Sequence, residues 1–241
     1  MSAPLVPIPL DSRKALGPDE IVRRLPPYFT ISVASKRNSG KSFLCRQLVQ
    51  MLIKQKKVDV VIVMSGSAGL NDDWEFVKER DPKAVMEYSE EILQRIFAKQ
   101  AALVRTWVAQ GAPKGKGQLP THVCVVLDDC LSSPEALRSP TIGTYYTKGR
   151  HVHASMICIS QHTSHLLTPI LRANSDIILW SKLNLQQLVQ LWESTTNIER
   201  KDFIRISESI GGHNYCFLLL DNITQTGEDP LDFLSVIRAV G

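Results

Sequence analysis

The sequence lacks the features that mark secreted, membrane-spanning and disulfide-bonded proteins. Its five cysteines are odd in number and show no CxxC spacing, so no disulfide framework is indicated. No apolar run is long enough to cross a bilayer, and the proline-containing beginning of the chain has no apolar signal-peptide core. We therefore expect a protein without a membrane span in a reducing, intracellular compartment.

A strong excess of charge of one sign is also missing. The 241 residues are 44% hydrophobic and 22% charged, which is ordinary for a soluble globular protein with a substantial core. The formal net charge of +4 favours polyanionic partners only weakly. Basic residues are nevertheless clustered between Lys36 and Lys57, where no acidic residue occurs, and again between Lys148 and His153. Each cluster is either a solvated face or a surface for nucleic acid.

Proline and apolar runs divide the chain into two predicted parts. Residues 1–27 are punctuated by proline and predict an arm or linker with a short helix at Asp19–Arg24. Residues 28–241 predict one domain, in which apolar runs alternate with helical patterns. The expected strands are Tyr28–Ala34, Val58–Met64, Val123–Leu127, Ala154–Ser160, Ile177–Trp180 and Cys216–Leu220. Several are apolar throughout, which is typical of parallel strands covered on both faces, so we expect an α/β fold with a mainly parallel central sheet flanked by helices.

Two helices are predicted from apolar residues that fall on one helical face. The shorter helix has its apolar face at Leu44, Leu48, Met51 and Leu52. The longer helix has its apolar face at Leu93, Ile96, Phe97, Val104, Trp107 and Val108. The glycine- and lysine-rich segment that follows, Gly111–Gln118, predicts an exposed, mobile loop.

The segment Ser-Lys-Arg-Asn-Ser-Gly-Lys-Ser at positions 35–42 is the strongest motif. It follows an expected strand and precedes an expected helix, which is the context that a Walker A phosphate-binding loop requires. Backbone N–H groups and the helix dipole favour phosphate there, and Gly40 lets the main chain approach it closely. Lys41 is placed to reach the β- and γ-phosphates, and Ser42 to ligate Mg²⁺. We expect ATP and Mg²⁺ as ligands, held by Ser35, Lys36, Arg37, Asn38, Ser39, Gly40, Lys41 and Ser42.

Ser35 stands where such loops usually begin with glycine. Serine resists a positive φ angle more than glycine does. Either the loop holds this position at negative φ, or some strain is stored there.

Two carboxylates follow the expected strand Val123–Leu127, as in a Walker B motif. Asp128 would belong to the Mg²⁺ shell, and Asp129 is placed to orient and deprotonate the attacking water. Gln161 follows the expected strand Ala154–Ser160, so it is either a sensor of the γ-phosphate and water or a cap of the strand end.

These motifs together resemble a known class of ATPases. Gln161, Arg150 eleven residues before it, and Leu171-Arg172-Ala173-Asn174 after it are similar to the FtsK–HerA class of DNA-pumping ATPases. Within that class, positions 35–42, the Asp128-Asp129 pair and Gly149-Arg150-His151 resemble the genome-packaging ATPases of double-jelly-roll DNA viruses and virophages. The similarity covers Tyr28 to Leu220. We accordingly expect a P-loop NTPase of the additional-strand (ASCE) type, with the acid and the sensor on neighbouring strands.

The resemblance also implies a function and partners. It implies a homo-oligomeric ring that hydrolyses ATP at subunit interfaces and translocates double-stranded DNA, with capsid proteins as further partners. The expected location is the host cytoplasm, a viral factory or the virion. Arg150 matches the arginine finger that such a ring supplies in trans, and Arg172 is the second candidate. For DNA contacts we expect Lys114, Lys116 and Lys148.

Two departures from the family pattern bear on hydrolysis. Ser35 replaces the more frequent glycine, and Asp129 replaces the glutamate found in many relatives, which puts the rate of hydrolysis in question more than nucleotide binding. The alternative functions are a cellular DNA pump of the same class and a slowly hydrolysing nucleotide-binding switch or scaffold.

Overall fold

The structure is a computed structural model that describes residues 16–68, 72–112, 119–130, 133–137, 139–161, 163–166, 168–195, 198–211, 213–223 and 234–239. These residues form an eight-stranded sheet with the strand order β3-β2-β4-β5-β1-β6-β7-β8. The strands are β1 (Thr30–Ser35), β2 (Val60–Ser65), β3 (Val85–Met86), β4 (Val123–Asp128), β5 (Ala154–Ser160), β6 (Ile177–Ser181), β7 (Cys216–Asp221) and β8 (Leu234–Arg238). The six predicted strands are all present, and β3 and β8 are additional.

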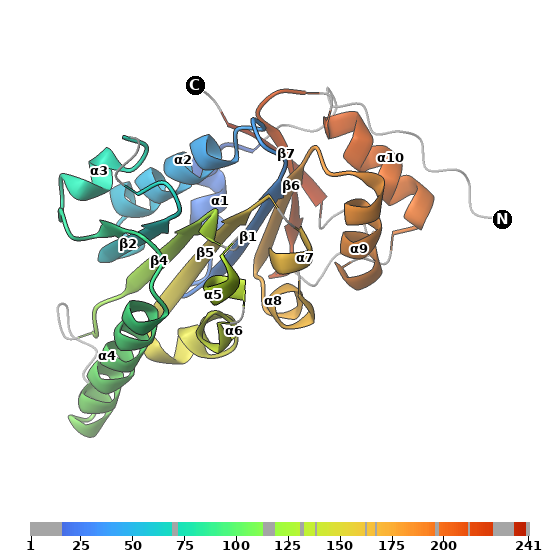
Figure 1. Ribbon diagram of the computed structural model, residues 1–241. Coiled ribbons are helices and arrows are strands. Elements are labelled where there is room, and N and C mark those ends of the chain that lie inside the picture. Colours follow the sequence, from blue (N-terminus) through green and yellow to red (C-terminus); the bar gives the residue numbers. More distant parts are fainter. Residues whose placement is uncertain are drawn as a thin grey trace.

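The sheet is parallel from β3 to β6 and antiparallel at β7 and β8. Strand β5 lies between β1 and β4, so an additional strand separates the strand of the phosphate loop from the strand of the acidic pair. In Figure 1, β4 and β5 run side by side toward the same edge of the sheet. The predicted α/β fold with a mainly parallel sheet is confirmed.

Helices cover both faces of the sheet (Figure 1). The described helices are α1 (Pro18–Arg24), α2 (Lys41–Lys54), α3 (Glu75–Lys78), α4 (Glu90–Ala109), α5 (Pro134–Leu137), α6 (Pro140–Lys148), α7 (Thr163–Leu166), α8 (Pro169–Ala173), α9 (Leu185–Thr195) and α10 (Arg200–Gly211), with a 3₁₀ turn at Gly149–Val152. Among the described helices, none is both long enough and apolar enough to be a membrane span.

Side chains alternate along the central strands between two separate apolar cores. On β4, Val123, Val125 and Leu127 join the core beneath α4, α6, α9 and α10. Cys124 and Val126 face the opposite core, which α1, α2 and α3 cover. Every residue of β1, β4, β5 and β6 is buried, because helices pack on both faces of these strands.

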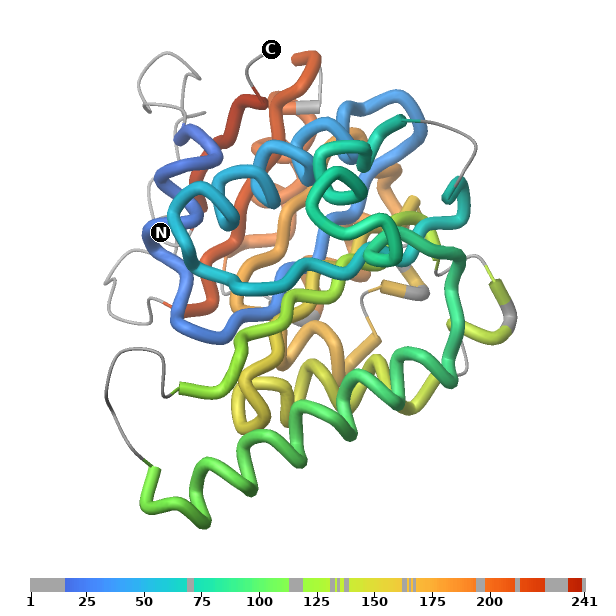
Figure 2. Tube along the Cα trace, turned by 90° about the vertical axis from the view of Figure 1, so that its left-hand side faces the viewer, coloured from blue at the N-terminus to red at the C-terminus, as the bar shows by residue number. Residues whose placement is uncertain are grey.

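Helix α4 departs from the expected pattern at its end. Figure 2 shows its last turns extending past the sheet. Leu93 is fully buried, but Val108, on the same predicted apolar face, is 57% exposed. The apolar face of α4 is therefore not buried along its whole length, because the helix continues past the sheet.

Residues 16–27 lie against the domain. The N–H of Leu16 donates to the carbonyl of Val236 in β8 at 2.8 Å, and Ile21 and Val22 of α1 are buried. The short helix predicted at Asp19–Arg24 is therefore present as α1. Residues 1–15 lie outside the described part of the chain, and the division into an arm and a domain stays a prediction.

Candidate functional site

The carboxyl ends of β1, β4, β5 and β6 lie at one edge of the sheet, which we call the carboxyl edge. Neighbouring strands pair Ser35 with Ser181 and Asp128 with Ile159 at this edge. Because the strands are parallel, the segments that follow them meet there, and ligands of open α/β sheets bind in this position. The predicted phosphate loop, acidic pair and sensor all come from these segments.

The predicted phosphate loop contains two residues with left-handed backbone conformations. Asn38 and Gly40 adopt left-handed conformations, with φ of 59° and 90°, and Gly40 is the N-cap of α2. Ser39 is buried, and its Oγ has no hydrogen-bond partner among the described residues. A loop with a buried free hydroxyl at a helix N-terminus fits a phosphate group, which accepts hydrogen bonds.

Ser35 is the last residue of β1 rather than a strained loop residue. Its Oγ donates to the carbonyl of Ser181 on the neighbouring strand β6 at 2.7 Å. The first of the two alternatives for this position is therefore correct, and a glycine is not required because the backbone stays extended.

Lys41, Asp129 and Gln161 come together beside this loop. Lys41 Nζ lies 3.1 Å from Asp129 Oδ2, and Gln161 Nε2 donates to the same oxygen at 2.9 Å. The side chain of Lys41 is 7% exposed and that of Asp129 is 35% exposed. Lys41 and Gln161, which are far apart in sequence, thus contact the same carboxylate oxygen of Asp129.

Asp129 owes its position to an unusual turn. Its N–H donates to the carbonyl of Ile159 at 3.0 Å, which extends the pairing of β4 with β5 by one residue. The residue then adopts φ of 54°, a conformation that aspartate tolerates better than most side chains. The residue that directly follows β4 therefore carries the carboxylate that contacts Lys41.

Asp128 is more deeply buried than its neighbour. Trp74 Nε1 donates to its Oδ2 at 3.0 Å. Burial raises the pKa of the Asp128 carboxyl, the hydrogen bond from Trp74 opposes this change, and the nearby charge of Asp129 adds to it. Two adjacent carboxylates in a buried position favour a bound cation, and carboxylate and hydroxyl oxygens are ligands that Mg²⁺ prefers. The predicted pair of Asp128 and Ser42 fits that ion chemically.

The two arginines lie elsewhere. Arg150 is exposed in the 3₁₀ turn before β5, so it lies at the amino edge, where the parallel strands begin. Strand β5 has seven residues and therefore separates Arg150 from the carboxyl edge of its own subunit by about 20 Å. Arg172, on α8, donates from Nη1 to the carbonyl of Gln190 at 3.3 Å. The structure joins neither arginine to the Lys41–Asp129–Gln161 group.

Sequence patterns missed two aromatic contacts at the carboxyl edge. Trp74 is 2% exposed and holds Asp128, and the Tyr215 ring lies against Gly40. Neither residue belongs to a local motif. Only their positions in the chain, Trp74 after β2 and Tyr215 before β7, could have indicated that they lie near the site. Both segments lie at the edge where the parallel strands end.

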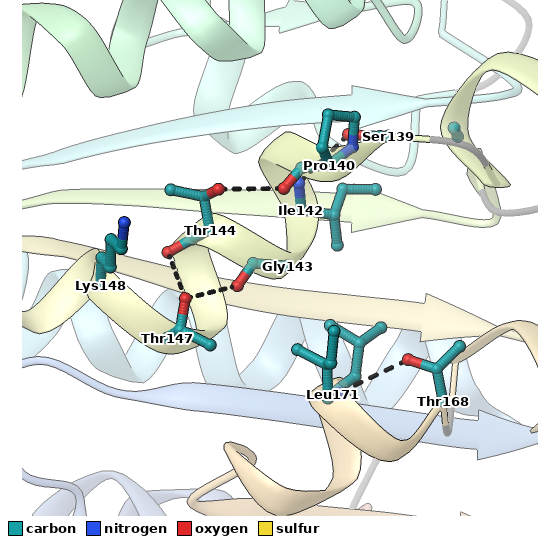
Figure 3. A pocket seen from close by; sticks show the side chains of 11 residues that line it. Ser139, Pro140, Ile142, Gly143, Thr144, Thr147, Lys148, Thr168 and Leu171 are labelled. Carbon is teal, nitrogen blue, oxygen red and sulfur yellow. Dashed lines mark hydrogen bonds between the residues drawn. The ribbon is translucent and has the colours of Figure 1, made fainter.

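A separate pocket of about 400 Å³ opens between α6 and α8 (Figure 3). The hydroxyls of Thr144 and Thr147 line it, but they donate to carbonyls of α6 itself. Its walls are otherwise largely apolar, and its lining, taken from the described residues, includes no part of the phosphate loop or the acidic pair. This pocket is therefore distinct from the predicted nucleotide site.

Comparisons with known proteins bear on the fold. No protein-family model matches the chain. The chain is 24% identical over 196 residues to an uncharacterised protein, 015R, of Frog virus 3 (isolate Goorha). The match covers 80% of this chain, which spans about half, 56%, of the length of that curated relative.

Solved structures of ATPases share the architecture. The DNA-packaging ATPase B204 of Sulfolobus turreted icosahedral virus has a TM-score of 0.59 and 13% identity, covering 90% of this chain and 99% of its own. B204 of Sulfolobus turreted icosahedral virus 2, in complex with ATP-γ-S, has a TM-score of 0.56 and 15% identity, covering 89% and 98%. The pCW3 conjugation coupling protein TcpA has a TM-score of 0.59 and 14% identity, covering 87% and 59%. The P-loop ATPase fold implied by the resemblance to the FtsK–HerA class is thus confirmed.

Proposed function

We propose that this protein is an ATP-driven translocase of double-stranded DNA that packages a viral genome into a capsid. The observation that carries this proposal is the meeting of Lys41, Asp129 and Gln161 beside the phosphate loop. Support also comes from the shared fold of B204, which is a DNA-packaging ATPase, and from the similarity to a viral protein. The proposed site of action is inside the host cell, where capsids are assembled.

The loop at positions 35–42 would hold the phosphates of ATP. Its backbone N–H groups and the Lys41 ammonium stabilise the negative charge, and Ser42 and Asp128 would hold Mg²⁺. When bound, this ion supplies further positive charge against the phosphate oxygens. The role of Lys41 implies that its ammonium leaves Asp129 for the phosphates when ATP binds.

Asp129 would then be free to act as the general base. It takes a proton from the water that attacks the γ-phosphorus, while the bond from that phosphorus to the bridging oxygen of ADP breaks. Gln161 donates to this carboxylate from the end of the neighbouring strand, and from there it would orient the water. An aspartate is one methylene shorter than a glutamate, so the water has to approach closer to β4 than in relatives with glutamate.

Arg150 would complete the site of a neighbouring subunit. Because β5 separates it from its own nucleotide site, it can act on ATP only in trans. A contact between the amino edge of one subunit and the carboxyl edge of the next is heterologous, and such contacts form a ring when the rotation between neighbouring subunits closes. The guanidinium would stabilise the charge that develops on the γ-phosphoryl oxygens.

DNA contacts are proposed for Lys148, which is exposed at the amino edge, and for Lys114 and Lys116. Lys148 is exposed at the end of α6, close to Arg150. Lys114 and Lys116 lie outside the described residues, in the segment that leads into β4. These contacts would be made with phosphates, because a motor that moves DNA has to pass every base sequence.

The proposal is tested by measuring ATP turnover across protein concentration, with and without duplex DNA. We expect turnover per subunit to rise with concentration as rings form, and to rise further with DNA. Affinity for DNA should fall steeply with salt, with a log–log slope of about −0.9 for each phosphate neutralised. Lys148→Ala should make this slope shallower, while Lys99→Ala, an exposed change on α4, should not. Turnover that is slow and indifferent to DNA would instead indicate a nucleotide-binding switch.

The same assay does not separate a packaging motor from a cellular DNA pump, because both use the same chemistry. Binding to capsid proteins would separate them. We expect the ring to associate with assembled capsid shells, and a ring that translocates DNA without binding any shell would favour the pump.

A further inference from the structure

Tyr215 lies directly on the phosphate loop. It occupies the turn before β7, which begins at the carboxyl edge because β7 runs antiparallel to β6. A Cβ added to Gly40 would come within 2.5 Å of the Tyr215 Cδ1, so the ring occupies the space that a larger residue at position 40 would need. The Tyr215 ring also meets that of Phe43, on the first turn of α2, with centroids 5.9 Å apart at 65°.

The backbone of Tyr215 has an unfavourable conformation, and its side chain is open to solvent. Tyr215 has φ of 60°, which is strained for a bulky side chain, and the residue is 50% exposed. Beside it, Lys182 at the end of β6 also has a left-handed backbone, and its Nζ donates to Asn214 Oδ1 at 2.9 Å. Strained residues of this kind persist where the surrounding structure fixes them, and they concentrate at ligand-binding sites.

We propose that Tyr215 is the stacking platform for the purine base of the nucleotide whose phosphates bind at positions 35–42. This inference rests on the proposed nucleotide-binding function and adds the subsite for the base. Phosphates at the loop place the ribose and base beside it, and the open tyrosine ring offers an aromatic surface there. Stacking tolerates different bases because every base has a π-face. The site should therefore bind ATP and GTP with similar affinity, and both more tightly than the smaller-ringed CTP.

The test compares ATP with inorganic tripolyphosphate, which carries the phosphates without a base. Affinities for both are measured by calorimetry in the presence of Mg²⁺. For Tyr215→Ala we expect ATP affinity to fall by about tenfold or more, the usual effect of removing an aromatic platform from a stacked base. Affinity for tripolyphosphate should stay unchanged, and Tyr215→Phe should keep the wild-type affinity for ATP.

A second variant shows whether a loss of affinity in Tyr215→Ala arises from misfolding. Tyr215→Gly removes the ring while relieving the strained backbone, because glycine adopts positive φ readily. It should show the same selective loss of ATP affinity. Tyr88→Ala, a partly buried tyrosine that bonds Glu90 elsewhere in the fold, is the control and should change neither affinity.

Three outcomes would overturn the proposal. If the Ala and Gly variants bind ATP as tightly as the wild type, Tyr215 does not hold the base. If both variants lose affinity for ATP and for tripolyphosphate to the same extent, Tyr215 maintains the conformation of the phosphate loop instead. If the wild-type protein binds neither ligand, the proposed function falls together with this inference, whereas the first two outcomes leave it intact.

Discussion

Two groups of buried polar residues, one at each edge of the central sheet, are organised differently. At the carboxyl edge, Lys41, Asp128 and Asp129 crowd three charged groups together, and Ser39 keeps a buried hydroxyl without a partner among the described residues. At the amino edge, His122 is buried within a chain of hydrogen bonds. Like charges in a buried position destabilise a fold, whereas satisfied neutral groups stabilise it. The group at the carboxyl edge therefore favours the proposed binding of a ligand, whereas the chain around His122 stabilises the packing of the strands.

The hydrogen bonds at the amino edge determine the protonation of His122. Its Nδ1 lies 2.7 Å from the carbonyl of Lys57, which can only accept, so Nδ1 carries the proton. Nε2 therefore accepts from the Ser155 hydroxyl at 2.7 Å, and Ser155 Oγ accepts from the N–H of Phe29 at 3.0 Å. A neutral ring satisfies every group in this chain, and a second ring proton would break it.

The largest expected effect follows from removing the charge at the carboxyl edge. Lys41→Ala should abolish measurable ATP binding and hydrolysis, because the phosphates lose the ammonium that faces them. Lys54→Ala, at the other end of the same helix, removes an equal charge near the amino edge and should leave ATP binding unchanged. Calorimetric titration with ATP and a turnover assay measure both effects. Tight ATP binding by Lys41→Ala would mean that the loop does not hold the phosphates.

The next largest effect is expected for Arg150, which we propose acts at the amino edge of one subunit on ATP bound at the carboxyl edge of its neighbour. Arg150→Ala should bind ATP normally but hydrolyse it more slowly by about 10³, the scale of known arginine fingers. Mixing these subunits with Lys41→Ala subunits should restore part of the activity, since only mixed rings contain an intact loop facing an intact arginine. Arg172→Ala should not show this complementation. If neither arginine complements in mixed rings that demonstrably form, the finger in trans is ruled out.

A smaller loss of ATP turnover should follow when only the proposed general base, Asp129 at the carboxyl edge, is removed. Asp129→Asn should keep ATP binding and lower turnover by about 10²-fold or more, because an amide cannot accept the proton of water. Asp81→Asn, an exposed aspartate after α3, is the matched control and should turn over normally. Single-turnover kinetics with saturating ATP measure the chemical step. Wild-type turnover by Asp129→Asn would place the general base on another residue.

His122 at the amino edge should affect stability rather than activity. Burial lowers the pKa of His122 to about 4, from an ordinary value of 6.5. Between these values the unfolded chain binds the extra proton, so the free energy of unfolding should fall as the pH falls from 6.5 toward 4. The loss should reach about 3 kcal/mol, since one pKa unit corresponds to about 1.36 kcal/mol. Urea unfolding across this range measures the slope.

A substitution separates His122 from the other groups that titrate in this range. His122→Gln should flatten much of the pH dependence, whereas His213→Gln, at an exposed position, should preserve it. Burial also lowers the pKa of His153, so a weaker slope of the same sign should persist in His122→Gln. An unchanged slope in that variant would mean that His122 does not control the acid sensitivity of the fold.

Much of the fold and part of the site could be predicted from the sequence, because the signals are local. Apolar runs of β-branched residues mark the central strands, and the glycine, lysine and serine at positions 40–42 suit a phosphate loop wherever a strand leads into a helix. The short strand β3 has only two residues and carries no pattern, and β8 follows a segment outside the described residues. The exposure of the end of α4 could not be predicted, because periodicity does not reveal where the sheet beneath a helix stops.

The sequence by itself determined the parallel α/β character of this protein, its phosphate loop and its acidic pair, because each depends on neighbouring residues. Only the tertiary structure decided that Lys41 and Gln161 share one oxygen of Asp129, that Trp74 holds Asp128, and that Tyr215 covers Gly40. It also placed Arg150 at the edge opposite the proposed nucleotide site of its own subunit. These contacts depend on strand order and direction, which arise from packing the whole sheet and are not encoded in any single segment.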